Sequence, residues 1–193
     1  MKSIKLIVII SSSILVLALA FFTYEREWIK VKISKDNSQA QELSLLAKKI
    51  QEEVQLIDSE KNYQIKTLNN EQFLGHMTDG GGQLIGYFEN KKISKIVERL
   101  GLSYGVKTYE YYFLNEQLIL VIEKEEDFPD TNNTGTLDYT KVELVFEGHY
   151  YFNEGKLITT QVTGKKRFPE DAGTNIESSF IKMAKENVEL LLK

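Results

Sequence analysis

The chain has no cysteine, only two prolines and only two histidines among its 193 residues. Without cysteine there is no disulfide to stabilise an exported fold and no thiol nucleophile, and the acylated-lipoprotein route to a membrane is closed. With so little proline and little low-complexity sequence, a long disordered stalk is not expected. We therefore expect a folded domain whose stability comes from packing.

The scarcity of histidine argues against catalysis and metal binding. His76 and His149 lie in no triad or elbow motif, and no His-x-His or His-x-x-x-His spacing supports a metal site. We expect His149 to be a solvent-facing strand residue beside Glu147 and Tyr151. The prediction is no catalytic residue, no metal and no cofactor.

Basic residues are outnumbered, with 24 lysines and arginines against 28 acidic residues and a formal net charge of −4. Lys2 and Lys5 belong to the N-terminal segment, so the remainder of the chain is more acidic still. An acidic domain without a basic stripe is not expected to bind nucleic acid or anionic lipid headgroups.

The one long apolar run extends from Leu6 to Phe22 and is interrupted only by three serines. Because Lys2 and Lys5 precede it, residues 1–22 are predicted to be a signal peptide or an N-terminal membrane anchor. The rest of the chain would then be extracytoplasmic, in the periplasm or at the cell surface.

Cleavage of this segment is left open by the sequence. Ala18-Leu19-Ala20 has the small-x-small form of a signal peptidase site, which would release the chain after Ala20. Phe21 and Phe22 instead prolong the apolar run and favour an uncleaved anchor, with residues 6–22 in the cytoplasmic membrane.

After a predicted linker at residues 23–37, residues 38–193 are predicted to form a single domain. Ser38 to Asp58 is expected to be an amphipathic helix, because its apolar residues recur at helical intervals. A second amphipathic helix is expected from a capping box at Thr174 and Glu177 to the C-terminus.

Between these helices one motif occurs three times, starting at Tyr87, Tyr112 and Tyr151. An aromatic pair ends an extended run, polar turn residues follow, and an aliphatic residue opens the next run, as is typical of a β-hairpin. Strands are expected at residues 63–68, 83–88, 92–100, 104–113, 117–125, 139–152 and 156–165. The predicted class is α+β: an antiparallel β-meander of about six to seven strands with both helices packed on one face.

The stretches Gly86-Tyr87-Phe88, Tyr109 to Asn115 and Tyr150 to Leu157 resemble exported bacterial proteins of unassigned function that are built from such hairpins. The resemblance implies the fold and a bacterial-envelope location. It implies no catalytic residue.

Two regions are candidates for contact with a partner. Tyr104, Tyr109, Tyr111 and Tyr151 are expected to line a polar sheet face, where tyrosine provides contact area, although cross-strand aromatic pairing also accounts for them. Asp130 and Asp138 belong to the long loop at residues 127–138. Part of a calcium-loop spacing occurs there, but Lys141 stands where the bidentate glutamate should be, so we expect an acidic hairpin loop.

The sequence thus predicts an exported or membrane-tethered envelope domain of non-catalytic, binding type, with a protein or glycan partner and an inhibitor-like or immunity-like role. The alternatives are a small-ligand or lipid carrier and a carboxylate-based polysaccharide hydrolase. For the hydrolase the available strand carboxylates, which we interpret as solvated, are Glu110, Glu123, Glu143 and Glu147.

Overall fold

The structure is a computed structural model that describes residues 38–131, 135–168 and 173–193. The chain divides into two compact units, Met1–Leu46 and Ala47–Lys193. In the first unit the described residues, 38–46, are helical. The predicted signal or anchor segment and the predicted linker lie outside the described residues. Within those residues, no helix combines the length and the apolar character needed to cross a membrane.

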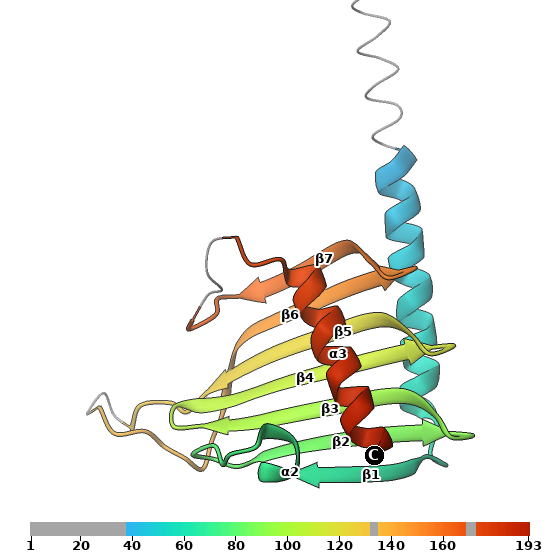
Figure 1. Cartoon of the computed structure of the whole chain (residues 1–193). Coiled ribbons are helices and arrows are strands. Elements are labelled where there is room, and N and C mark those ends of the chain that lie inside the picture. Colours follow the sequence, from blue (N-terminus) through green and yellow to red (C-terminus); the bar gives the residue numbers. More distant parts are fainter. Residues whose placement is uncertain (1–37, 132–134, 169–172) are drawn as a thin grey trace, which may run out of the picture. The chain divides into compact units, whose positions relative to one another are not determined.

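The second unit is built on one seven-stranded antiparallel sheet in which each strand pairs with its neighbour in the chain (Figure 1). The helical segment that began at residue 38 continues into this unit as far as residue 59. The α+β class and the β-meander are therefore confirmed. The elements are β1 (Gln64–Asn69), α2 (Glu71–Leu74), β2 (Gly82–Glu89), β3 (Lys92–Leu102), β4 (Gly105–Leu114), β5 (Gln117–Asp127), β6 (Glu143–Asn153), β7 (Lys156–Gly164) and α3 (Ile176–Leu192).

The repeated aromatic motif closes the hairpins β2–β3, β4–β5 and β6–β7. In each hairpin both turn residues have positive φ, the conformation of a two-residue type I′ turn; these residues are Asn90 and Lys91, Asn115 and Glu116, and Glu154 and Gly155. The register of each hairpin shifts between the tyrosine and the phenylalanine, at Tyr87/Phe88, Tyr112/Phe113 and Tyr151/Phe152. The three motifs are thus structural equivalents, each with the same turn and a bulge at the same place.

α3 packs on one face of the sheet, here called the α3 face. Phe180 of α3 lies against Tyr109 and Tyr150, with ring centroids 6.2 and 4.6 Å apart, respectively. The helix begins one residue later than a Thr174 cap predicts, because the Asn175 side chain accepts a hydrogen bond from the Ser178 amide at 3.0 Å.

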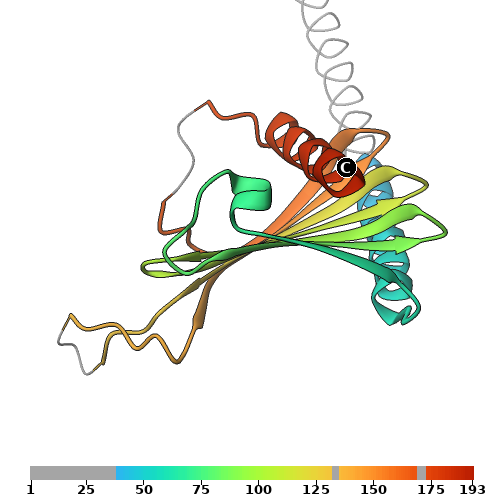
Figure 2. The same ribbon diagram turned by 60° about the horizontal axis from the view of Figure 1, so that its bottom comes forward.

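The helical residues 47–59 contact the other face, here called the opposite face. Gln51 Nε2 donates to the Tyr151 hydroxyl at 2.6 Å, and the Tyr112 hydroxyl donates to Asp58 Oδ2 at 3.1 Å. The prediction that both helices cover one face is therefore wrong, and Figure 2 shows the two helices on either side of the sheet. The reason is that the alternating strands place buried aromatic residues on both faces, so each face requires a cover.

Candidate functional site

A buried carboxylate lies beneath α3 at the centre of the sheet. Glu98 is 7% exposed, and its Oε2 accepts hydrogen bonds from the Tyr111 hydroxyl at 3.2 Å and from Asn187 Nδ2 at 2.9 Å. Burial raises the pKa of Glu98, and the two hydrogen bonds oppose that rise only in part. Both donors are neutral, so ionising this carboxyl group places a charge inside the α3 face.

Glu98→Gln is expected to stabilise the protein at neutral pH and to flatten its pH dependence. Because the folded pKa is raised, the contribution of Glu98 is fully present below its unfolded pKa and is lost as the pH rises through the folded pKa. Glutamine is neutral throughout and retains an oxygen to accept both hydrogen bonds. Thermal unfolding between acid and mildly alkaline pH checks this, with Glu143→Gln, at an exposed position, as control. A difference between Glu98→Gln and the natural chain that stays constant with pH would contradict it.

A second buried cluster joins β4, β5 and the segment after β7. Glu123 is 1% exposed. Its Oε2 accepts from Lys166 Nζ at 2.6 Å and from the Tyr150 hydroxyl at 3.0 Å. Lys107 Nζ lies 3.5 Å from Glu123 Oε1 and 2.7 Å from Glu125 Oε1. Two lysines thus balance two buried glutamates.

A cavity of about 230 Å³ adjoins this cluster on the α3 face. Burial and then the charge of Glu123 raise the pKa of Tyr109, so its ring remains a neutral phenol in the cavity wall. The volume is below the 300–1,000 Å³ or so that is usual for drug-sized ligands. The lining residues are Lys107, Tyr109, Glu123, Phe168, Thr174, Ile176, Ser179, Phe180 and Met183.

An ionic network lies on the opposite face, where residues 47–59 meet the sheet. Lys95 Nζ is 2.8 Å from Asp58 Oδ1 and 2.7 Å from Glu110 Oε2, while Lys124 Nζ is 2.9 Å from Glu110 Oε1. Burial alone would raise the pKa of Glu110, but the two lysines outweigh it and lower that pKa to about 2. The network therefore contributes to joining the helix to the sheet near neutral pH.

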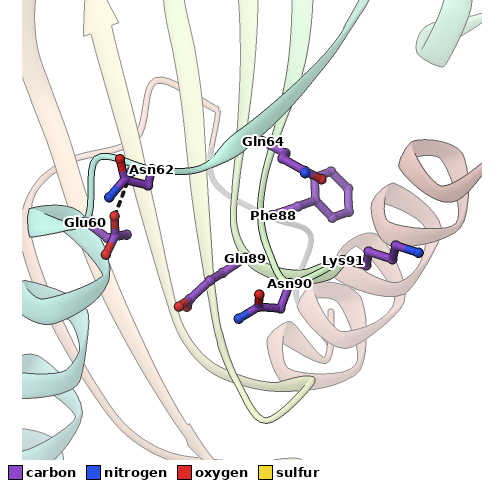
Figure 3. A pocket seen from close by; sticks show the side chains of 7 residues that line it. All are labelled: Glu60, Asn62, Gln64, Phe88, Glu89, Asn90 and Lys91. Atoms are coloured by element: carbon purple, nitrogen blue, oxygen red, sulfur yellow. Dashed lines mark hydrogen bonds between the residues drawn. The ribbon is translucent and has the colours of Figure 1, made fainter.

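A hollow of about 580 Å³ lies where the segment before β1 meets the β2–β3 turn (Figure 3). At the border of the hollow, the backbone N–H of Asn62 donates a hydrogen bond to Glu60 Oε1 at 2.6 Å. Phe88 is its one large apolar lining residue, and none of the buried glutamates lines it. The hollow therefore offers hydrogen bonds but little apolar anchoring. Its lining residues are Glu60, Asn62, Gln64, Phe88, Glu89, Asn90 and Lys91.

The connection between β5 and β6, residues 128–142, is here called the β5–β6 loop. Phe128 and Tyr139 meet edge to face near its base, with centroids 5.0 Å apart. The Asp138 amide donates to the Pro129 carbonyl at 2.8 Å, and Asp130 accepts from the Gly135 amide at 3.0 Å. The described part of the loop is thus held by its own hydrogen bonds.

This loop and the first residues of β6 leave large apolar side chains in solvent. Tyr139 is 67% exposed, Val142 45% and Leu144 54%. Leu144 pairs with Glu126 of β5, but β7 ends opposite Phe146, so no β7 residue lies beside it. These three residues, here called the loop patch, are accessible to a partner.

The structure places three of the four predicted contact tyrosines in the interior. Tyr109 and Tyr111 are 9% and 0% exposed beneath α3, and Tyr151 is 0% exposed on the opposite face. The prediction that they line an open sheet face is wrong for these three, because the helices cover both faces. Tyr104 is half-buried, with Phe168 edge to face at 5.4 Å and the Arg167 guanidinium 4.8 Å from its ring.

Asp130 and Asp138 lie in the β5–β6 loop as expected. Asp138 accepts hydrogen bonds from the amide and hydroxyl of Thr140, and these, with Lys141 at 3.1 Å, lower its pKa to about 2. Whether either aspartate contacts a partner stays a prediction.

His149 lies half-buried beside Glu147, which is within hydrogen-bonding distance, and its ring stacks on Tyr151 with centroids 6.4 Å apart. His76 Nδ1 lies 3.0 Å from the Leu74 carbonyl oxygen. Across residues 38–131, 135–168 and 173–193, no group of three or more histidine, aspartate or glutamate side chains could hold a metal ion.

The buried carboxylates differ from the sequence prediction. The interpretation of Glu110 and Glu123 as solvated strand positions is wrong, and Glu98 and Glu125 are not among the predicted residues. One pattern in β5 does indicate buried carboxylates: Val121, Glu123 and Glu125 occupy every second position and therefore share a face with an apolar residue. The pattern is hard to recognise in the sequence because charged residues also occur at the intervening positions of β5.

Comparisons with protein-family models, with curated proteins and with solved structures find no match to this chain.

Proposed function

We propose that this chain is an exported or membrane-tethered bacterial envelope domain that acts by binding, and that the loop patch contacts a protein partner. The observation that carries the proposal is the exposure of Tyr139, Val142 and Leu144 in one short segment. Exposed apolar side chains gathered in this way are typical of interaction sites. An inhibitor-like or immunity-like role belongs to this class, since it requires a shaped surface and no catalytic groups.

Acidic side chains accompany the loop patch and suggest the character of the partner. Glu143 lies between Val142 and Leu144 and is exposed, as is Asp130 in the loop. An apolar centre with a charged rim is the usual anatomy of a protein interface. The expected partner surface is therefore an apolar pocket bordered by basic residues, with association that slows as salt is added.

Two observations favour binding over the carrier and hydrolase alternatives. The cavity of about 230 Å³ on the α3 face is small for a lipid or a drug-sized ligand. Glu123, which lines it, is already paired with Lys166 and Lys107. Both oxygens of this carboxylate are thus already engaged by lysines, whereas a general acid in glycoside hydrolysis must reach the glycosidic oxygen.

The test is partner capture with a double variant, Tyr139→Ala with Leu144→Ala. In a crosslinking pull-down of the full-length, C-terminally tagged chain from native envelopes, we expect captured partner to fall at least about tenfold, because truncating an anchor residue at the centre of an interface costs about 2 kcal/mol or more. Quantitative mass spectrometry provides the readout, and circular dichroism establishes that the variant is folded.

Met77→Ala is the matched control, because Met77 is 65% exposed but lies outside the loop patch. Full capture by the double variant, or an equal loss with Met77→Ala, would reject the loop patch as the contact surface. Capture of glycan rather than protein would keep the binding class and change the partner.

A further inference from the structure

The sheet has two edges of different character, β1 and β7. β1 carries Lys66 within its paired residues, and an edge lysine discourages pairing with another strand. From Thr159 to Gly164, β7 has no charged residue and no proline. From Thr159 to Gly164 the β7 edge therefore lacks the charged residues and the proline by which proteins often protect a sheet edge.

The outer side of β7 is regular and accessible. A bulge at Ile158 interrupts its start, but the pairing with β6 is continuous from Tyr151↔Thr159 to Phe146↔Gly164. Residues 160–164 are all exposed, and Val162 is 58% exposed. Among the described residues, no strand pairs beyond β7. Alternate backbone N–H and C=O groups along this segment are therefore available to an added strand.

We propose that β7 pairs antiparallel with β7 of a second copy of this chain, with the two-fold axis at Gln161. In this register Gln161 lies opposite Gln161, Thr160 opposite Val162, and Thr159 opposite Thr163. Gln161 Oε1 accepts a hydrogen bond from the Tyr151 hydroxyl at 3.4 Å, but an amide side chain has two N–H donors and a second oxygen lone pair, so two Gln161 side chains can still bond to each other. Pairs of β-branched residues and of threonines are favourable across antiparallel strands. No charge meets a like charge between residues 159 and 163.

A second copy fits this edge better than the alternatives do. Pairing of two β7 strands is isologous and closes as a dimer, whereas pairing of β7 with β1 would be head-to-tail and would place Lys66 in the interface. From Thr159 to Gly164 the strand carries no charge, so this segment gives no electrostatic reason to select a different acidic or basic partner. The dimer uses the β7 edge, whereas the proposed partner contact uses the loop patch, so each can fail without the other.

Because the natural chain has no cysteine, a single engineered cysteine can show whether two β7 strands meet at Gln161. Gln161→Cys in the full-length chain, purified in mild detergent and oxidised with copper–phenanthroline, is expected to form a disulfide-linked dimer on a non-reducing gel. Gln161 and Thr67 both project from the opposite face and both are exposed, so Thr67→Cys on β1 is the matched control. Dimer yield with Gln161→Cys no greater than with Thr67→Cys would overturn the proposal.

A mass measurement tests the proposed dimer independently of the disulfide. Protein mass in the detergent complex, from light scattering, is expected to be that of a dimer for the natural chain and for Thr67→Lys. Gln161→Lys places two lysines opposite each other at the axis, so its dimer dissociation constant is expected to rise at least tenfold. A monomeric natural chain, or a Gln161→Lys dimer as stable as the natural one, would overturn the proposal.

Discussion

Glu123→Ala is expected to lower the free energy of unfolding by about 3–5 kcal/mol, because removing one partner of a buried ion pair is strongly destabilising. Lys166, whose side chain is 8% exposed, loses its contact at 2.6 Å, and Lys107 loses one of two acidic neighbours. The Tyr150 hydroxyl also loses an acceptor. Urea denaturation followed by circular dichroism measures the change.

Two further variants test whether the loss of stability comes from the buried charges. Glu143→Ala removes an exposed glutamate and is expected to change stability by less than about 0.5 kcal/mol. Combining Glu123→Ala with Lys166→Met removes both buried charges and is expected to recover part of the loss. A loss below about 1 kcal/mol for Glu123→Ala alone would mean that water already solvates the cluster.

The meander could be predicted from the sequence because hairpin formation is encoded locally. Each aromatic motif contains its own turn, and the observed hairpins β2–β3, β4–β5 and β6–β7 follow those turns. The second helix was predicted for the same reason, since its apolar periodicity and capping residues are adjacent in the chain. Its cap is nevertheless Asn175 rather than Thr174, a choice that depends on which side chain reaches the free amide.

The placement of the helices could not be predicted from these local patterns. Alternation shows that Tyr109 and Tyr111 share a face, but it does not show what covers that face. The cover comes from Phe180 and Asn187 in α3, which are distant in sequence. On the opposite face, a second helical segment covers Tyr112 and Tyr151. Both sheet faces are therefore covered where these tyrosines lie.

The candidate site was accessible to sequence reasoning only in part. The predicted loop, residues 127–138, is long and acidic, but the exposed apolar residues Tyr139, Val142 and Leu144 follow it, in the segment that the sequence predicts to be the strand 139–152. The buried ion cluster was not identifiable, because Lys166 is 43 residues from Glu123 in the chain and their pairing depends on the complete sheet. A strand glutamate has the same sequence signature whether it is solvated or neutralised by such a partner.

Tyr111→Ala is expected to unfold or severely destabilise the protein, by about 3–5 kcal/mol, because it leaves a large cavity in the core of the α3 face. It also removes a hydrogen-bond donor from Glu98, which then retains Asn187. Tyr111→Phe keeps the ring and is expected to cost only about 1 kcal/mol for the lost hydrogen bond. An exposed recognition tyrosine would behave differently, with partner capture lost and the unfolding midpoint unchanged. Measuring urea denaturation and partner capture on both variants separates the two cases, and an alanine variant of natural stability would show that Tyr111 is not part of the core.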